Sequence, residues 1–163
     1  MTTPPKADPA IYSVMRENVL RMQIPGPPVE GVRLVLMDWI VGNGTASVLA
    51  TFDGTASVYL SSGGGFIGGG QRHPEIAEAA KSAVKLAQEL LPAAMKSDAK
   101  VDAFELPQGD SVYFYLRTND AVFLAIAKEQ AMAAGSDPLT PLGGAMQAIV
   151  TGYRLARQQA SSK

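Results

Sequence analysis

The spacing of apolar residues changes along the chain, and each change marks the border of a predicted element. Residues 9–23 carry apolar side chains at helical intervals, and the Asp8-Pro9 pair before them is typical of a helix start. The Pro-rich segment 24–30 ends this helix as a stiff connector. Beyond it the pattern fits strands joined by Asn-Gly and Asp-Gly hairpin turns. The predicted strands of this first antiparallel meander are Val32–Val41, Thr45–Phe52 and Thr55–Ser61.

The second half of the chain again places a helix before a group of strands. A His-Pro-Glu sequence at residues 73–75 predicts the start of a long amphipathic helix, which Pro92 is expected to bend or end. Residues 128–134 fit either a short helix or a loop. A last helix begins at residues 136–138 or at residues 140–141, two competing starts of similar composition. The predicted strands of this second meander are Val101–Leu106, Ser111–Thr118 and Ala121–Ala127.

These elements predict the fold class α+β, with an antiparallel sheet of about five to six strands in two meanders and helices packed on it. The predicted order is helix, three strands, helix, three strands, helix. Residues 1–163 form a single predicted domain, in which residues 1–8 are a flexible N-terminus. Several strands are apolar on both faces, which indicates helices on both sides of the sheet or a dimer that covers one side.

The element order and the hairpin turns resemble the profilin-like architecture, and within it most closely the roadblock/LC7 modules. The residues that carry the resemblance are the strand–turn–strand Val48–Leu60 around its Asp-Gly turn, the Ala-rich helix Ile76–Met95 and the strand Asp120–Ile126. The resemblance covers most of residues 31–127 and implies a non-catalytic, dimerising module that serves as a scaffold or regulator. The chain departs from those modules by an additional first strand around Trp39 and by a glycine loop.

Composition narrows the classes of function. With 47% hydrophobic and 18% charged residues, the 163-residue chain can form an ordinary core, and its net charge of −1 argues against a nucleic-acid or anionic membrane surface. The absence of cysteine excludes disulfides and thiolate metal sites, and the single histidine excludes a multi-histidine site within one chain. No cofactor or metal is expected. The lack of an apolar leader or membrane-length segment predicts a cytoplasmic protein, and the alanine and glycine content points to a bacterial source.

A glycine loop between residues 61 and 73 is the most unusual segment. Its backbone can approach a ligand closely, and it leads into a helix N-terminus that favours anions. Three of its glycines match G-x-G-x-x-G, but the preceding strands are antiparallel, whereas a dinucleotide site needs a parallel βαβ unit. The structural alternative is a lid or a tight chain crossing. The candidate ligand-binding residues of loop 63–70 and the helix start are Gly63, Gly64, Gly65, Gly68, Gly69, Gly70, Arg72 and His73.

Four further sets of polar residues have both a chemical and a structural interpretation. His73 could act as a general base or simply enter the helix. Asp38 lies inside an apolar strand, either as a functional acid or as a strand-edge or dimer-interface contact. A carboxylate there needs a partner or a raised pKa, and Arg33 or Arg117 could be that partner. Tyr113 and Tyr115 share a face but lack the basic surroundings of a base-stacking platform. A hydroxyl stripe on two strands fits a polar pocket with Tyr59 or a solvated sheet face, and consists of Thr45, Ser47, Thr51, Thr55, Ser57 and Ser61.

Three functions follow as expectations. The first is a non-enzymatic homodimeric interaction, scaffold or regulatory module without catalytic residues. The second is a protein that binds a small anionic ligand at loop 63–70 and the following helix N-terminus. The third is an enzyme that uses His73 and Asp38.

Overall fold

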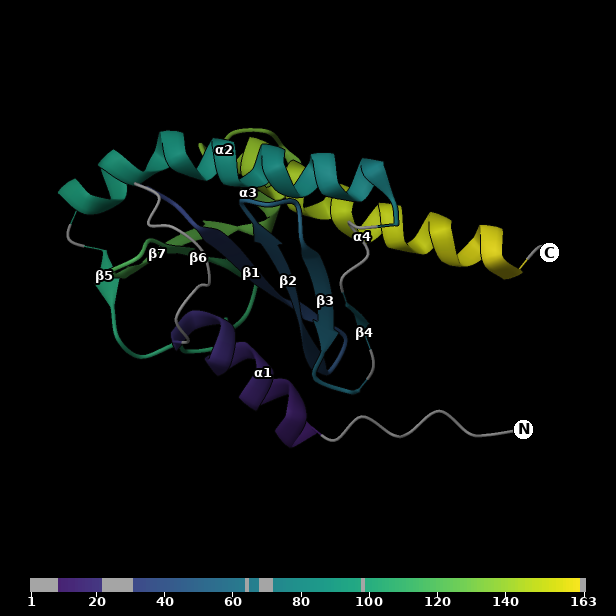
Figure 1. The fold of residues 1–163 in the computed structure, drawn as a ribbon. Helices are drawn as coiled ribbons and strands as arrows, with labels where there is room; N and C mark the ends of the chain where they lie inside the picture. The colour runs from purple at the N-terminus through teal and green to yellow at the C-terminus, as the bar shows by residue number, and fades with distance from the viewer. Residues whose placement is uncertain (1–8, 22–30, 64, 68–71, 98, 162–163) are drawn as a thin grey trace.

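A seven-stranded antiparallel sheet lies between helices on both of its faces in the computed structural model (Figure 1). The structure describes residues 9–21, 31–63, 65–67, 72–97 and 99–161. The strand order is β4-β3-β2-β1-β6-β7-β5, so the two halves of the chain meet where β1 pairs with β6. The predicted class α+β, with helices packed on an antiparallel sheet, is confirmed. The elements are α1 (Pro9–Arg21), β1 (Leu34–Val41), β2 (Gly44–Thr51), β3 (Ala56–Leu60), β4 (Gly65–Ile67), α2 (Pro74–Lys96), β5 (Lys100–Val101), β6 (Ser111–Arg117), β7 (Val122–Lys128), α3 (Glu129–Ala133) and α4 (Thr140–Ser161).

The first meander forms as the turn residues predict. Strands β1, β2 and β3 pair consecutively in antiparallel register, and the turns between them contain Gly42 and Gly54 with φ of 59° and 90°. Glycine is favoured at such positive φ values, because a side chain there crowds the backbone. Asp53 stabilises the second turn, since its Oδ1 accepts a hydrogen bond of 3.0 Å from the backbone N–H of Thr55. The sheet then gains an edge strand, because β4 forms inside the segment that the sequence predicts as a glycine loop.

The predicted second meander is wrong in its first strand. Only Lys100–Val101 is extended, as β5, and it pairs with β7 rather than with the neighbouring β6. The chain then leaves the sheet, because the carbonyl groups of Phe104 and Glu105 accept side-chain hydrogen bonds from Arg16 instead of joining a strand. Strands β6 and β7 form the remaining hairpin over seven paired residues each.

The helices also differ in part from the sequence prediction. Helix α2 starts at Pro74 with His73 as its N-cap residue, as predicted, but it continues through Pro92 to Lys96. Leu91, the residue directly before the proline, is buried in the core, so this part of α2 is packed on the sheet. Residues 129–133 take the helical alternative, as α3. Of the two possible starts of the last helix, the structure selects Thr140.

The two faces of the sheet carry different helices and different cores. Helices α2, α3 and α4 lie on one face and α1 lies on the other (Figure 1). The larger core joins strand residues such as Val35, Val48 and Phe114 to Ile76 of α2 and Met146 of α4. The smaller core, under α1, contains Tyr12, Leu20, Leu36, Leu49 and Tyr115. The apolar character of both strand faces is therefore explained by helices on both sides.

Candidate functional site

The predicted glycine-loop site is described only in part. Gly63 has a φ of 112° at the end of β3, and Gly65 lies in β4. Arg72 is exposed, and the Nδ1 atom of His73 lies 3.8 Å from a carboxylate oxygen of Glu75. The predicted residues Gly64, Gly68, Gly69 and Gly70 lie outside the described residues. The anion site in this loop therefore stays a prediction.

Asp38 is fully buried between β1 and α1, where it forms an ion pair. Its partner is Arg16 of α1 and neither Arg33 nor Arg117, so the predicted partner is wrong. The two guanidinium nitrogens Nη2 and Nε of Arg16 lie 2.6 and 2.9 Å from Oδ2 of Asp38. Oδ1 of Asp38 accepts a hydrogen bond of 2.5 Å from Ser47, whose hydroxyl lies 2.6 Å from the Tyr12 hydroxyl. The carboxylate is thus held by a neighbouring strand and by the N-terminal helix.

Burial and ion pairing shift the pKa values of Asp38 and Arg16 in opposite directions. Burial raises the pKa of Asp38, and the adjacent Arg16 and Ser47 oppose that rise. Burial acts to lower the pKa of Arg16, but the Asp38 carboxylate more than compensates, so the guanidinium pKa is raised. The Arg16 guanidinium also lies 5.2 Å from the ring centre of Tyr115 and donates to two backbone carbonyls. Every part of this cation is occupied by the protein itself, which is the arrangement of a structural ion pair.

The two arginines that the sequence offers as partners of Asp38 have other contacts. Arg33 is buried, donates to Asn119 at 2.9 Å and lies 4.5 Å from the ring centre of Phe52. Arg117 donates to the backbone carbonyl of Val19 at 2.8 Å and so helps to hold α1. Burial, together with the nearby charge of Arg33, lowers the pKa of Arg117.

The structure does not bring His73 and Asp38 together. Asp38 faces α1, whereas His73 begins α2 on the opposite face of the sheet. The hydroxyl stripe is not a solvated face either, because its members Ser47 and Ser57 are buried on the α1 side. The pair of residues on which the enzyme hypothesis depends is therefore separated by the sheet.

The ionisation of the Tyr12 phenol reports whether α1 is packed on the sheet. Burial raises its pKa from 10.0 to about 12. The folded state then holds this proton more tightly than the unfolded state, so its contribution to stability is complete below pH 10 and is lost as the pH rises toward 12. We expect Tyr12→Phe to reduce the tyrosinate absorbance change between pH 10 and pH 12, measured by spectrophotometric titration. A reduction confined to lower pH would contradict this assignment.

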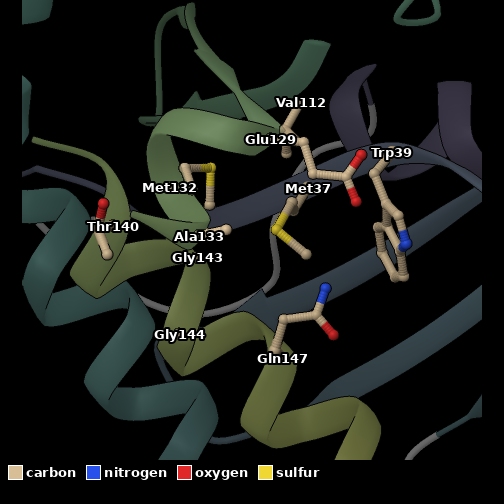
Figure 2. Close-up of a pocket in the computed structure, with 10 residues that line it drawn as sticks. All are labelled: Met37, Trp39, Val112, Glu129, Met132, Ala133, Thr140, Gly143, Gly144 and Gln147. Atoms are coloured by element: carbon tan, nitrogen blue, oxygen red, sulfur yellow. The ribbon is translucent and has the colours of Figure 1, made fainter. Parts of the chain in front are cut away.

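A pocket of about 280 Å³ opens on the other face of the sheet (Figure 2). Three segments of the chain enclose it: β1 with the start of β6, the short helix α3, and the first turns of α4. Its floor is apolar, and polar groups come from the helices. The lining residues are Met37, Trp39, Val112, Glu129, Met132, Ala133, Thr140, Gly143, Gly144 and Gln147.

Two adjacent glycines of α4 line this pocket, and only the second leaves open space in it. A Cβ atom at Gly143 would lie 2.0 Å from Cε of Met132, so only glycine allows this methionine its observed position. A Cβ atom at Gly144 would meet no atom within 4 Å. Glycine is unfavourable in a helix interior by about 1 kcal/mol relative to alanine. The two glycines therefore destabilise α4 locally, at the place where the helix borders the pocket.

The polar groups of the pocket lie at both of its ends. Figure 2 shows Glu129 and Trp39 on one side of Met37, with the Gln147 amide beyond the end of the Met37 side chain. Thr140 lies toward the opposite end, and its Oγ1 is buried without a hydrogen-bond partner among the described residues. Such buried atoms are rare because an unmade hydrogen bond costs free energy.

Sequence reasoning missed this pocket. The signal that could have found it is the Gly-Gly pair at residues 143–144 inside an otherwise helical pattern. Trp39 is noted in the sequence only as part of an additional strand, and Glu129 lies in the segment whose structure is left open. The contact between β1 and α4 is long-range, so no local pattern connects these residues.

Neither the described residues nor comparison with known proteins assigns a further site or a family. Among the described residues, no group of three His, Cys, Asp or Glu side chains is arranged to hold a metal ion. In the same part of the chain, no helix combines the length and apolar character that crossing a membrane requires. Comparison of the chain with protein-family models, curated proteins and solved structures finds no match.

Proposed function

We propose that this protein binds a small organic molecule in the pocket between β1, α3 and α4. The observation that carries the proposal is an apolar floor with a few polar side chains around it, which is the usual composition of a ligand site. The helical glycines at 143–144 support it, because alanine at the open position 144 would favour the helix and narrow the pocket.

The volume limits the size of the occupant. An apolar cavity of about 150 Å³ accommodates benzene, so by proportion a volume of 280 Å³ accommodates roughly ten to twelve non-hydrogen atoms. A ligand of this size is smaller than a nucleotide and comparable to a single substituted ring. We propose a binding or regulatory role rather than catalysis, because the described lining residues include no histidine, lysine or serine that could work with Glu129 as an acid–base pair. Homodimerisation stays a prediction beside this proposal.

The fluorescence of Trp39 tests the proposal directly, because it is the only tryptophan in the chain and lines the pocket. We expect 2-phenylethanol, a neutral probe smaller than the pocket, to change this emission saturably with a Kd in the millimolar range. Gly144→Leu should weaken binding by about tenfold or more, since its side chain extends from the pocket wall.

Thr151→Leu is the matched control, because Thr151 is an exposed residue of α4 that does not line the pocket. It should leave binding unchanged. Circular dichroism should show both variants folded. The proposal is wrong if Gly144→Leu and Thr151→Leu bind alike, or if neutral, cationic and anionic probes all leave the emission unchanged.

A further inference from the structure

We propose that the occupant of the pocket is a small amphiphilic amine, with its ammonium group at Glu129 and Trp39 and its apolar part over Met37 and Met132. This inference rests on the proposed binding function and adds the chemical class of the ligand. It follows from the charge, the aromatic wall and the hydrogen-bond acceptors of the lining residues.

The charge of the pocket has one sign. Glu129 is the one charged residue among those that line it in the described structure. The adjacent Lys128 is directed elsewhere, because its Nζ lies 3.2 Å from Oδ1 of Asp110 and 3.2 Å from the hydroxyl of Ser111. The described residues provide no ion pair within 4.0 Å of the Glu129 carboxylate. Glu129 is exposed, so solvent screens part of its charge, but a carboxylate at the border of an apolar floor still favours a cation over an anion.

The indole of Trp39 strengthens this preference. Trp39 and Glu129 both line the pocket, and Figure 2 shows their side chains on the same side of Met37, so a cation at the carboxylate would have the indole as a neighbour. Tryptophan is the aromatic side chain that attracts cations most strongly through its π face. A carboxylate and an indole together select an ammonium group more strongly than either does alone.

Gln147 lies on the far side of Met37 from Glu129. Figure 2 shows its amide nitrogen toward Met37 and its carbonyl oxygen directed away, so Glu129 is the acceptor for an ammonium group, which has three N–H donors. The rest of the occupant would contact Met37, Val112 and Met132, whose side chains are apolar and in part flexible. The pocket therefore distinguishes a charged end from an apolar end, which is the chemistry of an amphiphilic amine.

Three probes with a common phenyl ring test the sign of the charge: 2-phenylethylamine, 2-phenylethanol and phenylacetate. We expect the protonated amine to bind about tenfold more tightly than the alcohol, and phenylacetate to bind most weakly, by calorimetry and Trp39 fluorescence at neutral pH. Glu129→Gln should remove most of the preference for the amine and leave the affinity for the alcohol unchanged. Glu89→Gln, an exposed position of α2 outside the pocket, is the matched control and should preserve the preference.

The outcomes separate this inference from the function on which it rests. If the alcohol binds as tightly as the amine and Gly144→Leu weakens both, the binding function stands and the amine assignment is overturned. Tightest binding of phenylacetate, or an amine preference that Glu129→Gln leaves intact, also overturns the assignment. If no probe binds, both the inference and the proposed function fail.

Discussion

Replacing Asp38 with alanine is expected to destabilise the protein by about 3–5 kcal/mol, because it leaves the charged Arg16 buried without its partner. Arg16 is 4% exposed and cannot turn to water without lifting α1 from the sheet. Ser47 also loses the acceptor of its hydrogen bond. The free energy of unfolding, measured by urea titration with circular dichroism, should fall by this amount.

Two further variants show whether the loss comes from the buried charge. Arg16→Met with Asp38→Leu removes both charges and should recover most of the stability, since an apolar pair can replace a buried ion pair. Glu17→Gln, which breaks the exposed ion pair with Arg21 on the same helix, should cost about 0.5 kcal/mol or less. Equal losses for Asp38→Ala and Glu17→Gln would show that the buried pair has no special role.

The second large effect is expected where α2 crosses α4. Ile76 of α2 is fully buried, and a Cβ atom at Gly152 of α4 would lie 2.7 Å from its Cγ1 atom. Ile76→Ala should therefore destabilise the protein by about 2–5 kcal/mol, because it leaves a cavity between the two helices. Unfolding in urea or on heating measures the change.

Gly152→Ala tests whether this close approach depends on glycine. In the natural sequence the added methyl group should overpack the crossing and cost about 1–3 kcal/mol. In the Ile76→Ala background the same change should fill space and become neutral or stabilising, so the double-mutant cycle should show strong coupling. Gly144→Ala is the control on the same helix, where the methyl group meets open space and should stabilise the helix by about 1 kcal/mol. Absence of coupling between positions 76 and 152 would contradict the packing.

Local chemistry made most of the fold predictable. The predicted bounds of most strands and helices lie within a few residues of the observed ones. The signals were the hairpin glycines, the proline in the first turn of α2 and the alternation of apolar residues. The failures have a tertiary cause. Residues 102–106 look extended in isolation, but Arg16 takes the carbonyl groups that a strand would need. The helix through Pro92 likewise continues because of packing that composition does not report.

The candidate site was less predictable than the fold. The burial of Asp38 could be expected from its apolar strand, but its partner lies 22 positions away on a helix whose direction across the sheet is not encoded locally. The pocket requires β1 and α4 to meet, and the residues Trp39 and Gln147 are separated by most of the chain. Only the helical glycine pair marks the place in the sequence.

The position of α1 has a consequence for the order in which the chain can fold. Arg16 contacts Asp38 in the first hairpin region and also the carbonyl groups of Phe104 and Glu105, and Val19 receives a hydrogen bond from Arg117. Helix α1 precedes the other described elements in the chain, but its contacts are complete only after residue 117 has been synthesised. Because contacts of such separation in sequence slow folding, we expect α1 to dock late, after the β1–β6 pairing has joined the two halves.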